Sequence, residues 1–358
     1  MTKDADKRII GVALKLGEAR NREKIDEIAR VLELQPNVVL LDLRIREDSE
    51  TTLIKFVSEV SCAVRALLPV CQKIFELLDY SQYPPYGKAC GSLSSVVFIP
   101  VRNLTLKECE IVIENFAQAI YQQFSQPVYF MGPQLDTKIT NAQTRNELIR
   151  YTPKKQLNEV FEKNNIRPDI GESGYDPTKG VTFIGLRRFV VTISFYLDTE
   201  DVELAEDIAE EISATGVKVY DREGQPVLDS SGEPIRKPGK FPNVDAIAIG
   251  MAEERLTRII CNLQDYTSPN IFELYDEIKK VADQYMVEIL GSNIIGFLPW
   301  EAIEIALESE NSTGASSYPE QIERFKKRLG LDLFSQFNPQ WQIIDFRFIP
   351  YHTDNSQI

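Results

Sequence analysis

Histidine is almost missing from this chain: among 358 residues the only one is His352, near the C-terminus. It lies in a polar tail, where a solvated side chain is expected rather than a catalytic one. There is also no Walker loop, no G-x-G-x-x-G and no nucleophile elbow. Nucleotide binding and hydrolase chemistry therefore have no support in the sequence.

Cysteine is scarce as well, with five widely spaced residues and no C-x-x-C pair. This spacing favours buried reduced thiols over disulfides or a zinc site. The acidic run over residues 201–211 is predicted to be the solvated face of a helix. The sequence thus predicts no metal site.

Basic residues are outnumbered, with 40 Lys and Arg against 54 Asp and Glu and a net charge of −14. This balance argues against a nucleic-acid partner, although a local basic groove could still hold an anionic small molecule. No apolar run approaches the roughly 18 residues of a membrane span. The N-terminal MTKDADKRIIGV lacks the apolar core of a signal peptide, so no membrane partner and a cytoplasmic location are expected.

Hydrophobic periodicity in the first half predicts the order β-α-β-β-α-β, the split ferredoxin-like unit. The strands are expected over 8–16, 37–45, 51–60 and 95–101, and the helices over 21–34 and 63–78. A helix over 105–124, a strand over 127–131 and two helices over 141–150 and 154–164 extend this half.

The same order returns in the second half, so we expect an α+β fold of duplicated ferredoxin-like (βαββαβ) subdomains. Its strands are predicted over 186–197, 244–250, 258–263 and 287–290, and its helices over 200–215 and 268–285. The predicted parts are a first subdomain over 1–180, a second over 181–309 with a polar hairpin insert at about 217–243, and a C-terminal part over 310–358. That last part is predicted to hold a helix over 319–329 and an aromatic tail that packs on the body and ends in an edge strand.

The stretch LLDYSQYPPYGKACGSLSSVVFIPV, residues 77–101, resembles the central motif of the glutamate formiminotransferase family. That motif reads roughly L-I-D-M-x-x-H-x-G-x-H-P-R-x-G-x-x-D-x-x-P-F-I-P-V and aligns without a gap. The family's first His falls on Tyr83, its second on Gly87, its Arg on Ala89 and its Asp on Ser94. The frame of the motif is present while its polar groups are replaced.

Further matches run through nearly the whole chain in the family order. The family's L-L-D is found at residues 40–42, its P-V-Y-L-Y-G at 127–132, its P-D-F-G at 168–171 and its G-A-R-x-F-L-I-A-F-N at 185–194. The last Asn of that motif is Ser194 here, and the Asn-Arg of the family's N-R-T is Glu50 and Thr51. Lys15 and Glu50, on neighbouring predicted strands, are expected to form an ion pair.

The resemblance implies a formiminotransferase fold, a homodimer and a part in histidine degradation. It also implies transfer of a formimino group from formiminoglutamate to N5 of tetrahydrofolate, with the folate held between the two halves. The nitrogen that attacks must lose a proton and the leaving nitrogen must gain one, which suits a histidine. Folate and glutamate carboxylates need Arg, Lys or backbone N–H donors.

From these matches we derive candidate site residues. Tyr83, at the place of the family histidine, and Asp79 are the catalytic candidates. A tyrosine starts about 4 kcal/mol worse as a base at pH 7 than an ionised group. The ligand-binding candidates are Asp42, Lys88, Gly185, Arg187, Ser194 and Asn262.

The leading hypothesis is a diverged homologue, a pseudoenzyme that keeps an inter-subdomain cleft for a folate-like or other anionic small molecule. One alternative is an active formimidoyl- or formyltransferase whose base is Asp79 or Tyr83. A further alternative is a structural or assembly protein that acts through the tail and the insert.

Overall fold

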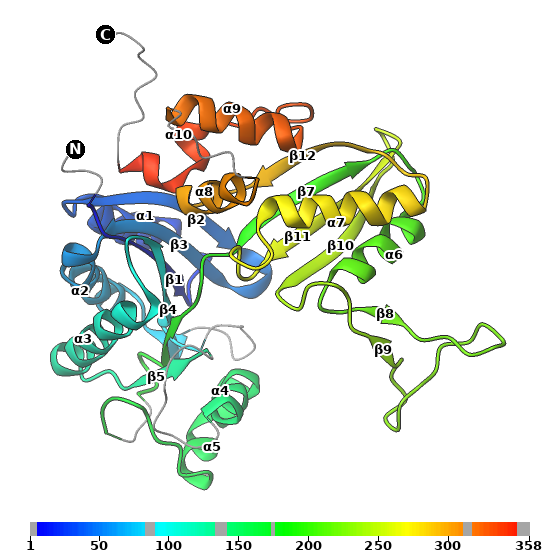
Figure 1. The fold of residues 1–358 in the computed structure, drawn as a ribbon. Coiled ribbons are helices and arrows are strands. Elements are labelled where there is room, and N and C mark those ends of the chain that lie inside the picture. The colour runs from blue at the N-terminus through cyan, green and yellow to red at the C-terminus, as the bar shows by residue number, and fades with distance from the viewer. Residues whose placement is uncertain (1–5, 83–89, 133–141, 173–175, 311–316, 349–358) are drawn as a thin grey trace, which may run out of the picture. The chain divides into compact units, whose positions relative to one another are not determined.

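The computed structural model describes residues 6–82, 90–132, 142–172, 176–310 and 317–348. The chain is a mixed α/β protein in two compact units, Met1–Arg188 and Phe189–Ile358. Figure 1 shows the order of the elements along the chain. Among the described residues, no helix is both long and apolar enough to cross a bilayer.

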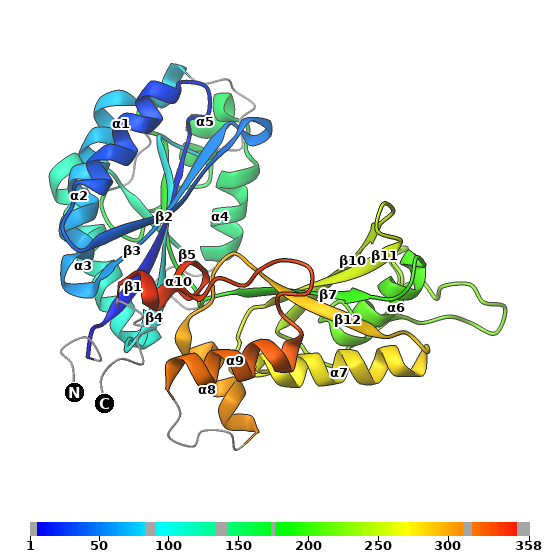
Figure 2. The same ribbon diagram turned by 90° about the horizontal axis from the view of Figure 1, so that it is seen from above.

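The first unit is built on a sheet whose strands follow the order β2-β3-β1-β4. Each strand alternates apolar residues, as in β1, where Val12 and Leu14 belong to the core beneath the helices. Helices α1, α2 and α3 cover that face (Figure 2). The bounds are β1 (Ile9–Leu16), α1 (Arg22–Glu33), β2 (Val38–Arg46), β3 (Thr51–Glu59), α2 (Val60–Leu77), β4 (Leu93–Arg102) and α3 (Leu106–Phe124).

Two parallel strands, β6 (Thr182–Leu186) and β5 (Val128–Met131), extend this sheet beyond β4. The single strand predicted over 186–197 is therefore wrong, because the chain enters two different sheets on either side of residues 187–190. Helices α4 (Ala142–Tyr151) and α5 (Leu157–Lys163) pack at this end of the sheet, opposite α1–α3 (Figure 2). Their core includes Tyr129, Phe161 and Phe183.

The second unit holds a four-stranded sheet with the order β10-β11-β7-β12. Its core side carries Ile193, Phe195, Ile259 and Cys261, all fully buried. The bounds are β7 (Val191–Leu197), α6 (Val202–Ile212), β10 (Val244–Met251), β11 (Leu256–Leu263), α7 (Ile271–Gln284) and β12 (Ile289–Ile295).

The segment between α6 and β10 leaves the sheet as a projecting arm with two tight turns (Figure 1). Short strands β8 (Val217–Lys218) and β9 (Arg236–Lys237) pair at its base. Asp221 and Asp229 each accept backbone N–H groups at a turn, and Gly224 and Gly232 have positive φ there. Such side-chain bonds to the following backbone are typical of Asx turns.

The C-terminal part packs into the core of the second unit through Phe325, Leu329 and Phe346. The predicted edge strand is wrong, since residues 339–347 form a short helix and a 3-10 turn. Buried Asp345 ties this segment to the start of an earlier helix, because its Oδ2 accepts the backbone N–H of Trp300 at 2.7 Å. The bounds are α8 (Trp300–Ser309), α9 (Tyr318–Leu329) and α10 (Pro339–Gln342).

Candidate functional site

The face of the first sheet that points away from α1–α3 carries a row of cross-strand neighbours. The row runs through Asp42, Lys55, Ala13, Val97 and Gly185. Since α4 and α5 pack at the β5–β6 end, the part over β1–β4 has no described helix of this unit on it (Figure 2). We call this surface the open face.

Charged groups gather on the open face. Arg44 Nε lies 2.8 Å and Lys55 Nζ 3.5 Å from Asp42 Oδ2, although neither is aligned as a hydrogen bond. Burial lowers the pKa of Lys55, Asp42 opposes that effect, and the charges of Arg44 and Arg187 lower the pKa further. The surface is thus a half-buried cationic patch around one carboxylate.

Three predicted ligand-binding residues, Asp42, Gly185 and Arg187, lie on this side of the sheet, although Asp42 on β2 and Gly185 on β6 are separated by three strands. Arg187 follows β6, and its backbone N–H donates to Phe98 O at 3.1 Å. Within the described part of the first unit its guanidinium has no ion-pair partner. Gly185 also has a packing role, because an added Cβ would lie 3.0 Å from Met131 Cγ.

Lys55 was missed by the sequence analysis. Its signal is the alternation in β3, where Ile54 and Phe56 point into the core and Lys55 points the other way. Because successive side chains of a strand point to opposite faces of the sheet, Lys55 between these two core residues must lie on the open face.

Asp79, a predicted catalytic residue, lies apart from this patch at the end of α2. Its carboxylate accepts the Ser81 N–H at 2.9 Å and a weaker bond from Gln82 at 3.4 Å. Hydrogen bonds from Ser81 lower its pKa, even though some desolvation acts in the opposite direction. A carboxylate that loses its proton more easily is a poorer base, so a capping role describes Asp79 better.

The two described ends of the central motif are fastened to the turn over residues 176–181. Tyr80 N donates to Thr178 O at 2.6 Å, and Val181 N donates to Cys90 O at 2.8 Å. Ser94, which replaces the family Asp, accepts the N–H groups of Cys90 and Gly91 at 3.0 and 3.2 Å. Its hydroxyl is used within the loop, so no ligand role for Ser94 follows.

Two predicted site residues, Tyr83 and Lys88, lie outside the described residues. Near the family's Asn-Arg position, the Thr51 hydroxyl bonds to Ser49 at 2.9 Å, and Glu50 forms an ion pair with Arg20. The expected pair of Lys15 with Glu50 is therefore wrong: Glu50 sits in a left-handed turn that points it toward Arg20.

Ser194 and Asn262 belong to the second unit, on the face of its sheet opposite α6 and α7. Asn262 pairs with Thr192 across the strands, and the Thr192 hydroxyl donates to Asn262 Oδ1 at 2.8 Å. Ser194 is fully buried, and its hydroxyl has no hydrogen-bond partner among the described residues. These two residues share one face, on which Ser194 lies between Ile260 and Asn293 of the neighbouring strands.

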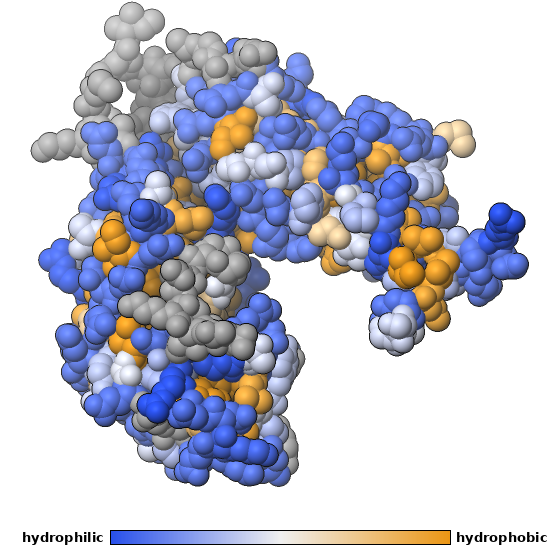
Figure 3. Space-filling model, turned by 60° about the horizontal axis from the view of Figure 1, so that its bottom comes forward, coloured by the Kyte–Doolittle hydropathy of each residue, from blue (hydrophilic) through white to orange (hydrophobic). Residues whose placement is uncertain are grey.

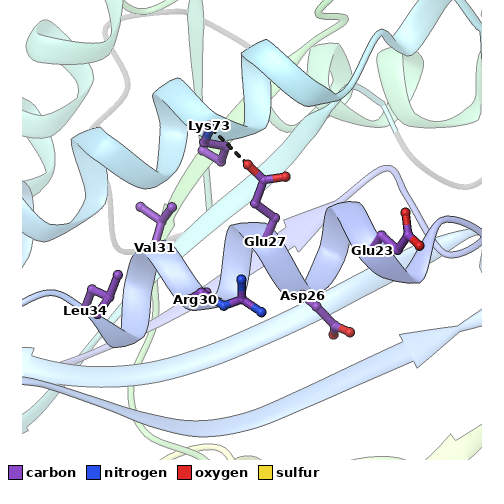
Figure 4. Close-up of a pocket in the computed structure, with 7 residues that line it drawn as sticks. All are labelled: Glu23, Asp26, Glu27, Arg30, Val31, Leu34 and Lys73. Carbon is purple, nitrogen blue, oxygen red and sulfur yellow. Dashed lines mark ion pairs between the residues drawn. The ribbon is translucent and has the colours of Figure 1, made fainter.

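A surface groove along α1 and α2 does not coincide with any of these residues. Figure 4 shows its lining, in which Glu27 reaches Lys73 at 3.1 Å while Glu23 and Asp26 point away from each other. Exposed charges on a helix pair are typical of a solvated surface. Across the described residues, no cluster of three or more His, Cys, Asp or Glu side chains could hold a metal ion.

Cys62 is expected to be the first cysteine that reacts in the folded protein. It is half-buried, and a hydrogen bond from Asn37 together with nearby Arg65 lowers the pKa of its thiol. Burial instead raises the pKa of Cys71, Cys90 and Cys109. Mass spectrometry after brief native alkylation should find a single adduct that C62S removes, and equal labelling of a second cysteine would contradict this.

Two family models match the chain. Residues 9–187 match "Formiminotransferase domain, N-terminal subdomain", and residues 188–349 match "Formiminotransferase domain". The two matched segments meet beside Arg188, where the structure also divides. Together they cover far more than half of the chain.

Curated relatives agree with these models. The formimidoyltransferase-cyclodeaminase of Mus musculus is 26% identical over 332 residues, which is 92% of this chain and 58% of the relative. The glutamate formimidoyltransferase of Streptococcus pyogenes serotype M1 is 21% identical over 83% of this chain and 91% of the relative. The chain thus spans little more than half the length of the animal relatives.

Among solved structures, the periplasmic protease PqqL from Escherichia coli matches at a TM-score of 0.15 and 10% identity. That match covers 95% of this chain and 39% of the protease. A likeness at this level supports no inference.

Proposed function

Because the chain belongs to the formiminotransferase family, we propose that it is a diverged member that binds a reduced folate or a related anionic small molecule. The observation that carries this proposal is the cationic open face of the first sheet. In a chain of net charge −14, Arg44 and Lys55 lie beside Asp42, and the charge of Arg187 is near enough to lower the pKa of Lys55. Cationic side chains in this arrangement are suited to bind an anionic ligand through charge-assisted hydrogen bonds.

The residues present fit a folate. Ala13 and Gly185 lie between the charged ends of the row, but Ala13 is only 8% exposed and Met131 packs over Gly185, so the anion is placed at the charged ends. Lys55 and Arg187 are suited to carboxylates, which accept charge-assisted hydrogen bonds. Asp42 can accept from ring N–H donors at the other end. In the family's reaction, the folate would supply the nitrogen that receives the one-carbon group.

We also propose that each unit is a ferredoxin-like subdomain, so that the fold is a duplicated pair. In each sheet, the four strands of the βαββαβ repeat lie side by side in the same order: the second in sequence, then the third, the first and the fourth. This order is β2-β3-β1-β4 in the first unit and β10-β11-β7-β12 in the second. That order, with a helix after the first and third strands, is the one expected of a βαββαβ unit.

Standard formimino transfer is proposed to be lost. The family histidine position is Tyr83, and the chain has no histidine apart from His352. The pKa of Asp79 is lowered and the pKa of Cys90 is raised, so both shifts lead away from pH 7, near which a general base works best. We therefore propose that the chain binds the folate-like ligand but does not carry out the proton transfers of the formimino-transfer reaction.

Calorimetric titration with 5-formyltetrahydrofolate, a stable reduced folate, tests this proposal. K55Q and R187Q are each expected to weaken binding about tenfold, because each removes one charge-assisted contact of at least about 1.5 kcal/mol. The matched control is R22Q on α1, which removes a cation from the opposite side of the sheet. It should leave the affinity unchanged.

Equal affinities for wild-type, K55Q and R187Q would place the ligand elsewhere. Turnover of formiminoglutamate with tetrahydrofolate by the wild-type chain would instead favour an active transferase with a different base. These two outcomes separate the binding proposal from the loss of catalysis.

A further inference from the structure

The segment that joins α9 to α10, residues 331–337, is anchored at both ends, and we call it the strap. Leu331 and Phe337 are buried in the core of the second unit. Asp332 fastens the two ends together, since its carboxylate pairs with Lys326 at 2.7 Å and accepts the Phe337 N–H at 2.5 Å. The middle of the strap can therefore move while its ends stay in place.

The middle of the strap lies on the face of the second sheet opposite α6 and α7. The Phe334 ring stacks on Tyr196, with centroids 3.9 Å apart and planes inclined by 17°. Leu333 lies over Gly291, where an added Cβ would be 3.1 Å from Leu333 Cδ1. Yet Leu333 is 67% and Phe334 39% exposed, and neither belongs to the core. Tyr196 is thus covered by residues that remain largely in water.

The stack of Phe334 on Tyr196 is also not the arrangement that two protein rings prefer. Aromatic pairs favour offset or edge-to-face geometry, with centroids about 4.5–7 Å apart. A nearly parallel pair at 3.9 Å gives Tyr196 a flat cover on one ring face. This seat suits a planar ring system at least as well as it suits Phe334.

Exposed apolar residues of the second unit also gather on the arm (Figure 3). Those residues are Val219, Tyr220, Leu228 and Ile235. Their surface gives no indication of what would cover it. Phe334 differs, because it already lies on a seat whose shape and charge show what else can fill it.

A cation lies beside this seat. Gly291, Tyr196, Arg258 and Ile249 form one row across four strands, so Arg258 is the direct neighbour of Tyr196 on β11. Its Nε is buried and has no hydrogen-bond partner among the described residues, and no ion pair with it is formed there. A buried donor of a charged group is costly when it is left unpaired. The seat therefore combines a ring face with a donor for an anion.

We propose that Leu333 and Phe334 form a removable plug over a binding site for a planar aromatic anion. The ligand ring takes the place of Phe334 on Tyr196, and its anionic group accepts a charge-assisted hydrogen bond from Arg258. Gly291 leaves room beside the ring once Leu333 has lifted. The site is built from the second unit alone and does not depend on the cationic open face of the first.

Calorimetric titration with 2-naphthoate, a planar aromatic carboxylate, tests the site. F334A is expected to bind this probe about tenfold tighter than the wild-type chain, because the ligand no longer has to displace a competing ring. F334A/R258Q should lose about tenfold in affinity relative to F334A, since the charge-assisted contact is gone. The neutral isostere 2-naphthamide should likewise bind F334A about tenfold more weakly than 2-naphthoate does.

Matched controls separate this site from other surfaces. W341A removes an aromatic side chain that is 59% exposed in the same C-terminal part, and it should bind 2-naphthoate as the wild-type chain does. K55Q/R187Q should also leave this affinity unchanged, so the result is independent of the function proposed for the first unit. Equal affinity of F334A and F334A/R258Q, or of 2-naphthoate and 2-naphthamide, would overturn the site.

Fluorine NMR follows the plug itself, in a chain that carries 4-fluorophenylalanine at position 334. The ring of Tyr196 shifts this signal while the two rings are stacked. Saturating 2-naphthoate is expected to move the signal toward that of the free fluorinated amino acid. Binding that leaves the signal in place would overturn the plug. The absence of binding to both the wild-type chain and F334A at millimolar 2-naphthoate would overturn the whole proposal.

Discussion

The D169A variant is expected to lose about 3–5 kcal/mol of unfolding free energy. Asp169 and Arg145 form an ion pair at 2.7 Å, and their side chains are only 4% and 8% exposed. Asp169 also accepts the Phe130 N–H at 2.7 Å, and Arg145 lies 5.1 Å from the Tyr129 ring centre. Removal of the carboxylate leaves a buried guanidinium without its counter-charge.

Denaturant unfolding measures this loss, with E200A as the control. Glu200 and Arg255 also lie 2.7 Å apart, but they are 57% and 77% exposed, so E200A should cost less than about 1 kcal/mol. The double variant R145M/D169N removes both buried charges and should be more stable than D169A. If D169A and E200A cost the same, the buried pair does not hold α4 to the sheet.

Formimino transfer is expected to be slower by roughly 10²–10⁴-fold than in the relative from Streptococcus pyogenes, the usual effect of losing a general base. The reason is that Tyr83 stands at the family histidine position, while Asp79 is kept ionised by Ser81. The assay follows formiminoglutamate with tetrahydrofolate at high protein concentration, with both proteins measured side by side.

Y83H serves as the companion variant. Because the hydroxyl of Ser94 is bonded within its own loop at the family's Asp position, one histidine should restore less than about a tenth of the relative's rate. Full recovery in Y83H would show that the rest of the site is intact. Wild-type turnover at the relative's rate would show that another residue acts as the base.

The sequence predicted the βαββαβ order in both units because alternation and helical spacing are local signals. Strands such as β1 and β3 show this directly, with every second residue in the core. The predicted strand over 186–197 failed because it was read across Arg187 and Arg188, although Leu186 and Val191 enter different sheets. The tail was misjudged for a similar reason, since the bond between Asp345 and Trp300 joins residues far apart in the sequence.

The candidate site was predicted in part. Asp42 comes from one motif and Gly185 and Arg187 from another, and strand register places them on one face. Lys55 was overlooked because it belongs to no family motif, although its place in β3 requires an open-face position. Asp79 matched a motif, yet its bonds to Ser81 and Gln82 indicate a cap. A motif match therefore located residues without assigning their roles.

The most direct test of the account is the heat of binding of 5-formyltetrahydrofolate to the wild-type chain and to the double variant K55Q/R187Q. The account predicts a saturable titration for the wild-type chain and about a hundredfold weaker binding for the double variant, if the two contacts act independently. A flat titration of the wild-type chain at millimolar ligand, or equal affinity for both proteins, would contradict it.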